Sequence, residues 1–136
     1  MVMLVSADEG KGDASGSGAR RRYTRSMRLL RHADFERVYQ GGRRHFSAHM
    51  TVFYLRREDV SGARVGYTVS RALGGAVDRN RMKRRLRAVV RLSWAEMSGP
   101  FDIVINPKKS LLQADFEELK REVARAWEAV RRGKNQ

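Results

Sequence analysis

The sequence predicts a two-layer sandwich of the α+β class, with α/β as the alternative, in which helices pack on one sheet in the order αβββαβα. Three segments carry apolar residues at helical spacing, four shorter segments are β-branched and aromatic, and Gly, Pro and Ser separate them. With 136 residues, of which 41% are apolar, the chain is large enough for one domain with a modest core.

The first part of the chain is expected to be a tail. Residues 6–19 are rich in Gly and Ser and contain no aromatic residue, so they cannot bury enough surface to offset their ordering entropy. A basic arm follows between Arg20 and Arg25. We therefore expect a disordered tail over residues 1–22 and a single α-β domain over residues 23–136.

The domain begins with a helix and three strands. A helix is expected from Ala33 to Gln40, and Gly41 and Gly42 end it. Alternating β-branched and aromatic residues predict strands at three places, namely around 44–47, at 50–55 and at 64–70.

The second half supplies a basic helix, a strand and a last helix. The basic helix is expected over 77–97, and the strand over 101–105 closes at Pro107, which has no N–H to donate. The last helix is expected over 115–132, where Asp115 and Glu118 have the spacing of a capping box. Its expected buried stripe is Phe116, Leu119, Val123, Trp127 and Val130.

The densest positive charge lies between Arg79 and Arg91, where seven of thirteen residues are basic and none is acidic. On a helical wheel the apolar residues fall on one side, and a basic ridge runs beside them. The apolar edge is Met82, Leu86, Val89 and Val90, and the ridge is Arg79, Lys83, Arg87 and Arg91. Asp78 is expected to be the N-cap. A helix face that is merely solvated normally interleaves acids with bases, so we expect this helix to lie against a polyanion.

The composition narrows the class of partner that the chain is expected to bind. The chain has 29 Lys and Arg against 15 Asp and Glu, a formal net charge of +14, which favours RNA, DNA or an anionic membrane surface. No apolar run approaches the roughly 20 residues of a membrane span. The absence of cysteine excludes disulfides, thiolate metal sites and a cysteine nucleophile.

A conventional active site is hard to assemble from these residues. The histidines His32, His45 and His49 lack the spacing of metal ligands. The acids of the last helix are expected to form its solvated face; these are Glu117, Glu118 and Glu122. We therefore predict no catalytic residue and no metal held by this chain.

Aromatic residues near basic ones suggest a different chemistry. Phe35 and Tyr39 lie one helical turn apart, and Phe53 lies on the longest early strand. Arginines surround these segments: Arg43, Arg44, Arg64 and Arg71. Aromatic rings hold unpaired bases by stacking, worth about 1–3 kcal/mol per base, while arginines track phosphates. The alternative is that Phe35 and Phe53 belong to the core, as we expect of Trp94, Trp127 and Phe116.

Residues 27–132 resemble the protein subunit family of bacterial ribonuclease P. The most specific match is Gly74-x-Ala76-Val77-x-Arg79-Asn80-Arg81-x-Lys83-Arg84-x-x-Arg87. Supporting matches are Asp34-Phe35-x-x-Val38-Tyr39, Arg64-Val65-Gly66-x-x-Val69-Ser70 and the segment 101–105. Gly75 and Ala72 depart from the family pattern, which commonly has Asn and a basic residue there.

The resemblance implies a left-handed βαβ crossover through the basic helix and a role in removing the 5′ leader of precursor tRNA. It implies that a catalytic RNA performs the cleavage with Mg²⁺ bound mainly by RNA, so that the enzyme is a ribonucleoprotein endonuclease. The RNA-binding residues it implies are Arg79, Asn80, Arg81, Lys83, Arg84, Arg87 and Arg91. The leader-binding cleft it implies is formed by Phe35, Tyr39, Phe53 and Arg71.

The expected partners are the catalytic RNA and precursor tRNA in the cytoplasm, with no membrane and no required protein partner. Two other hypotheses remain. A DNA-binding module would place the basic helix in a major groove, although Ser98-Gly99-Pro100 ends the helix where a zipper would continue. A structural ribosomal protein would share the charge but lack the leader cleft.

Overall fold

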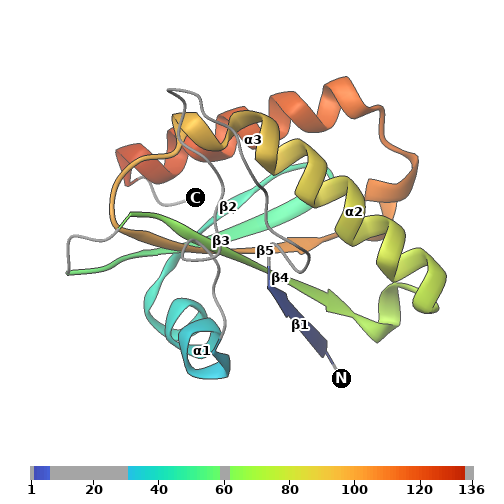
Figure 1. Cartoon of the computed structure of the whole chain (residues 1–136), viewed down its shortest axis with the longest axis horizontal. Coiled ribbons are helices and arrows are strands. Elements are labelled where there is room, and N and C mark those ends of the chain that lie inside the picture. The colour runs from blue at the N-terminus through green and yellow to red at the C-terminus, as the bar shows by residue number, and fades with distance from the viewer. Residues whose placement is uncertain (1, 7–30, 59–61, 134–136) are drawn as a thin grey trace, which may run out of the picture.

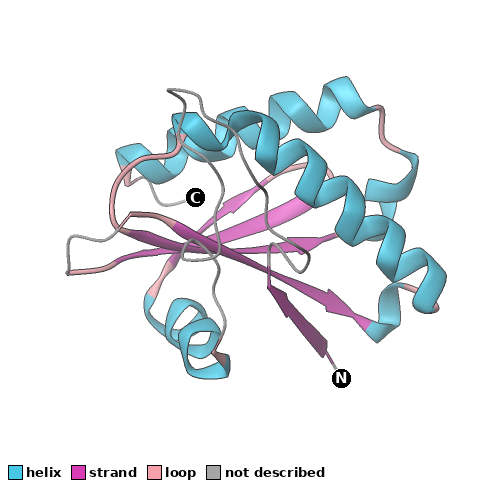
Figure 2. Ribbon diagram, viewed as in Figure 1, coloured by secondary structure: helices cyan, strands magenta, loops and turns pink. Residues whose placement is uncertain are grey.

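A computed structural model describes residues 2–6, 31–58 and 62–133 of the chain. Helices cover both faces of a mixed five-stranded sheet of order β1-β4-β5-β3-β2 (Figures 1 and 2). In chain order the elements are β1 (Val2–Ser6), α1 (His32–Gly41), β2 (Arg43–Phe46), β3 (Met50–Arg56), β4 (Arg64–Ser70), α2 (Ala76–Ser93), β5 (Phe101–Pro107) and α3 (Phe116–Arg132). Short 3₁₀ helices are η2 (Arg71–Leu73), η3 (Trp94–Glu96) and η4 (Lys109–Gln113). From α1 onward this confirms the predicted α+β order.

The first strand is a correction to the predicted tail. Val2–Ser6 pairs antiparallel with β4, whereas the sequence pattern predicts a tail at these residues. A Val-Met-Leu-Val run has strand propensity, and pairing covers the edge that β4 would otherwise expose. The Gly/Ser-rich segment and the basic arm of the predicted tail lie outside the described residues.

The connection through α2 is the one parallel crossover among the described strands. β4 pairs parallel with β5, while β5–β3, β3–β2 and β1–β4 are antiparallel. The chain leaves β4, passes through α2 and returns in β5, its sheet neighbour. The left hand of this crossover stays a prediction from the resemblance.

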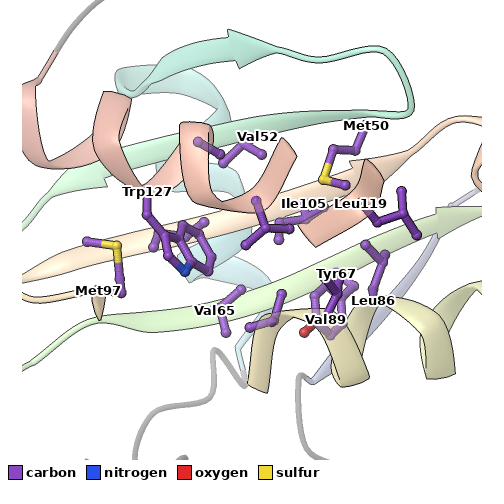
Figure 3. Close-up of a cluster of buried hydrophobic side chains, with 14 of the residues drawn as sticks. Met50, Val52, Val65, Tyr67, Leu86, Val89, Met97, Ile105, Leu119 and Trp127 are labelled. Atoms are coloured by element: carbon purple, nitrogen blue, oxygen red, sulfur yellow. The ribbon is translucent and has the colours of Figure 1, made fainter. Parts of the chain in front are cut away.

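The main core lies between the sheet and the helices α2 and α3. Figure 3 shows Leu86 and Val89 of α2 and Leu119 and Trp127 of α3 facing strand residues such as Ile105. All five are at most 1% exposed. The buried apolar edge predicted for the basic helix is therefore confirmed, as is the stripe of α3 except for Phe116, which is half-buried.

The opposite face of the sheet is covered by α1, which Figure 1 shows on the other side from α2 and α3. Phe35 and Val38 of α1 bury Val104 of β5, and three partly buried side chains pack around them: Tyr39, Phe53 and Leu55. Strand alternation explains this second core, because odd positions of β3 point toward α1 while even positions point toward α2 and α3. The helices therefore sit on two faces of the sheet.

The predicted N-cap of α2 is wrong, and the N-cap of α3 is at the predicted residue but makes no side-chain hydrogen bond. Helix α2 starts at Ala76 with Gly75 as N-cap, so Asp78 lies inside the first turn. Gly74, at φ 144°, adopts a conformation that favours glycine, which lets the chain turn into the helix earlier than expected. The carboxylate of Asp78 still lies near the positive end of the helix dipole, where a negative charge is stabilised. Helix α3 begins after Asp115, whose backbone oxygen, rather than its side chain, accepts a hydrogen bond from the Glu118 N–H.

Candidate nucleic-acid interface

Helix α2 turns its cationic side away from the core. Met82, Leu86, Val89 and Val90 are buried, and the predicted RNA-binding residues occupy the rest of the helix surface. Four of these are exposed, namely Asn80, Arg81, Arg84 and Arg91, and three are half-buried, namely Arg79, Lys83 and Arg87. The predicted residues thus lie together on one helix.

Among the described residues, acids do little to neutralise Arg81, Lys83 and Arg84. Arg81 lies 3.8 Å from Asp78, and both side chains are about half exposed, an arrangement worth little in water. Within the described ranges, no hydrogen bond or ion pair to an acid occupies Asn80, Lys83 or Arg84. These side chains therefore retain hydrogen-bond donors and charge for an external anion.

Two arginines of α2 donate hydrogen bonds to backbone oxygens of the protein itself. Arg85, which the resemblance does not include among the RNA contacts, donates to the backbone oxygens of Leu111 (2.6 Å), Leu112 (3.1 Å) and Ala114 (2.7 Å). Arg79 donates to the Gly74 oxygen at 3.0 Å. Arg85 therefore ties η4 to the helix, and Arg79 holds the loop that precedes it.

A second candidate surface lies beside α1. The Tyr39 and Phe53 rings meet edge-on, with centroids 4.9 Å apart at 90°. The Tyr39 hydroxyl is 2.6 Å from Thr68 Oγ1 and donates to Asn106 Oδ1 at 3.1 Å. Burial raises the pKa of Tyr39, against the lowering effect of these hydrogen bonds. The structure therefore fixes the Tyr39 ring against Phe53.

The structure removes one predicted residue from this surface and adds one that was not predicted. Phe35 is 2% exposed and packs in the second core, so its ring offers no face for a base, and the core alternative applies to it. Phe46 is 54% exposed, and sequence reasoning missed it. The Arg44 guanidinium lies 5.5 Å from the Phe46 ring centroid and 5.9 Å from that of Phe53. The alternation Arg44-x-Phe46 on a strand was the available signal.

The remaining arginines near this surface are not equivalent. Arg64 donates from Nε and Nη2 to both oxygens of Asp102 at 2.9 Å, and Arg57 Nη1 donates to the same carboxylate at 2.5 Å. Arg64 is thus committed to a buried ion pair. Arg71 is exposed in η2, and within the described residues no ring contact or hydrogen bond joins it to the aromatic side chains.

The acids of α3 also depart from expectation. Glu117 is exposed, but Glu118 is half-buried and Glu122 is only 3% exposed. The one group of potential metal ligands in the described part of the chain consists of His49, Glu118 and Glu122. No helix there is long and apolar enough to cross a bilayer.

Fold and surface together define a class: basic α+β proteins in which a crossover helix turns an arginine-rich face outward. The sequence pattern of the ribonuclease P family matches residues 23–131. This chain therefore belongs to the ribonuclease P family, as the resemblance indicated.

Individual relatives agree. The chain is 47% identical over 88 residues to the ribonuclease P protein component of Oleidesulfovibrio alaskensis, covering 64% of this chain and 70% of that protein. It is 36% identical over 104 residues to that of Symbiobacterium thermophilum, covering 76% and 90%.

Solved structures share the fold. The RNase P protein of Staphylococcus aureus matches with a TM-score of 0.66 at 21% identity, covering 78% of this chain and 96% of that one. The RNase P protein of Thermotoga maritima matches with a TM-score of 0.64 at 24% identity, covering 72% and 93%.

Proposed function

We propose that this chain binds the catalytic RNA of ribonuclease P through α2 and holds the 5′ leader of precursor tRNA on the surface beside α1. The observation that carries the proposal is the outward cationic face of α2, whose Lys83 and Arg84 have no acidic partner among the described residues. Such charge repels itself and is stabilised when phosphates approach it.

On α2, the arginine and lysine side chains contact phosphates of the catalytic RNA. The helix N-terminus adds its partial positive charge near Arg79, Asn80 and Arg81. Arg85 is left out of this contact because its guanidinium is bonded to backbone oxygens of the protein. The contact is therefore electrostatic and sensitive to salt.

Beside α1, the leader is held by stacking. Phe46 presents the most exposed ring, Phe53 and Tyr39 continue the surface, and Arg44 lies between the two phenylalanines. Single-stranded bases stack on such rings without strong sequence preference, while arginines contact their phosphates. Arg71 is kept as a phosphate contact at the end of β4.

The chain supplies no catalytic group in this proposal. Cleavage belongs to the catalytic RNA and the Mg²⁺ that this RNA binds, in the cytoplasm and without a further protein. The protein's positive charge reduces repulsion between the catalytic RNA and precursor tRNA. Reconstituted cleavage should consequently need less Mg²⁺ with the protein than without it.

The test is reconstituted cleavage of precursor tRNA across Mg²⁺ concentrations with Lys83→Glu on α2 and Lys120→Glu on α3. The two variants make the same charge change, and Lys120 is an exposed lysine that pairs only with Glu117 among the described residues. Lys83→Glu should raise the Mg²⁺ requirement, and Lys120→Glu should behave as wild type. Equal behaviour of both variants contradicts the assignment of α2.

A comparison of nucleic acids separates the rival hypotheses. In the presence of the catalytic RNA, precursor tRNA should bind more tightly than mature tRNA. Equal binding to both would remove the leader site and favour a purely structural RNA-binding role. Tighter binding of duplex DNA than of either RNA would favour a DNA-binding module.

A further inference from the structure

Three side chains that are distant in sequence meet between the β2–β3 turn and α3. His49 Nε2 lies 3.2 Å from Glu118 Oε2 and 3.6 Å from Glu122 Oε2. All three ligand atoms lie within 4.8 Å of one another. Because Glu118 and Glu122 are four residues apart on α3, both carboxylates point from one helix face toward the imidazole.

These separations match a metal-ligand set. A tetrahedral Zn²⁺ bound at about 2.0–2.1 Å by each atom holds neighbouring ligand atoms about 3.3 Å apart. The two separations from His49 Nε2 to the carboxylates, 3.2 and 3.6 Å, lie on either side of that value, and the two carboxylate ligand atoms lie within 4.8 Å of each other. Histidine nitrogen and carboxylate oxygen are both ligand types that Zn²⁺ takes in proteins.

The surroundings orient each ligand. Ser110 Oγ lies 2.7 Å from His49 Nδ1 and can accept a hydrogen bond from it. In that tautomer the lone pair of Nε2 is directed at the carboxylates. The His49 backbone N–H donates to Glu122 Oε1 at 3.1 Å, which fixes that carboxylate. The Lys108 backbone N–H in turn donates to the His49 oxygen at 2.9 Å and holds the turn in place.

The independent observation is Glu122 itself. It is 3% exposed, and its Oε2 is a buried atom that no donor in the described residues satisfies by hydrogen bonding. A buried carboxylate oxygen without a hydrogen bond is costly, and a cation relieves the cost. This oxygen faces the His49 ring, where such a cation would be held.

A pocket on the protein surface borders two of the three residues. A surface pocket of about 500 Å³ is lined by Glu118 and Glu122 together with Arg121 and Arg125. Two carboxylates and one divalent ion sum to zero charge, so these arginines would face a neutral centre. The pocket leaves room for water as a fourth ligand.

We propose that His49, Glu118 and Glu122 bind one divalent transition-metal ion of the zinc type, joining the β2–β3 turn to α3. Mg²⁺ fits poorly, because it prefers six oxygen ligands in an octahedron. This proposal concerns the protein alone and does not depend on its binding RNA.

The test uses the full chain, stripped of metal and without RNA, titrated calorimetrically with Zn²⁺. One equivalent should bind, and the Tm should rise by several degrees because the ion stabilises only the folded chain. Glu118→Gln should weaken binding by more than about tenfold. Glu118 is 43% exposed, so this change spares the fold. The matched control is Glu117→Gln on the same helix, which should bind as wild type.

Three results would overturn the proposal. Absence of stoichiometric binding would mean that the cluster is a histidine–carboxylate ion group without a metal. Equal Zn²⁺ affinity in the Glu118→Gln and control variants would place the ion elsewhere. An equal rise in Tm with Mg²⁺ would contradict the role of the imidazole nitrogen.

Discussion

At the scale of single residues, Asp102 is a buried charge in the sheet that two arginines neutralise. Its side chain is 1% exposed and is held by Arg57 and Arg64. Removing one partner of a buried ion pair leaves the others uncompensated, at a cost of about 3–5 kcal/mol. Asp102→Ala should lower the free energy of unfolding by this amount in denaturant titrations. The exposed control Glu117→Ala should change it by at most about 0.5 kcal/mol, and a similar small change in Asp102→Ala would contradict the account.

Phe46 gives a residue-scale test of the leader surface. Because its ring is 54% exposed, Phe46→Ala should cost little stability. It should weaken holoenzyme binding of leader-bearing precursor tRNA by about 1–3 kcal/mol, the value of one stacked base, and leave mature tRNA unaffected. Leu92, an apolar side chain that is 63% exposed on α2, provides the control Leu92→Ala. If both variants affect the two RNAs alike, Phe46 does not contact the leader.

At the scale of the element, α2 combines two kinds of arginine that the sequence does not distinguish. Arg84 is exposed, whereas Arg85 donates three hydrogen bonds to backbone oxygens next to and within η4. Arg85→Ala should lower the free energy of unfolding by about 2–3 kcal/mol, since charged hydrogen bonds are lost and carbonyls are left unpaired. Arg84→Ala should leave stability unchanged and weaken RNA binding. Denaturant titration and RNA affinity of both variants measure this, and a reversed pattern would refute it.

Helical periodicity made α2 predictable, because a period of 3.6 separates its apolar edge from its charges. Alternation with a period of 2 predicts β2 to β4, including 64–70 with both ends correct, but it does not predict β1. The helix caps are less predictable than the helices. The start of α2 at Ala76 depends on the φ angle of Gly74, which the composition does not reveal. Contacts between residues that are far apart in the sequence leave no local signal from which they could be predicted. Nothing local to Glu122 or Phe35 shows that the first accepts a hydrogen bond from the His49 backbone and that the second packs with Val104.

At the scale of the whole molecule, one sheet separates two surfaces. Helix α1 lies on one face and α2 on the other (Figure 1). The rings of Tyr39 and Phe53 pack on the α1 face. Under the proposed function, this arrangement would let the protein contact two RNA segments at once, because each segment would use different side chains. The net charge of +14 would favour both proposed contacts before any specific hydrogen bond forms.

The central claim, that α2 binds RNA through phosphate contacts, is tested most directly by the salt dependence of binding to the catalytic RNA. Each phosphate contact contributes about 0.7–0.9 to the slope of log affinity against log salt. Replacing Arg81, Lys83 and Arg84 together with Gln should reduce the magnitude of the slope by about 2–3, and Lys120→Gln should leave it unchanged. If the triple variant keeps the wild-type slope, α2 does not face the RNA.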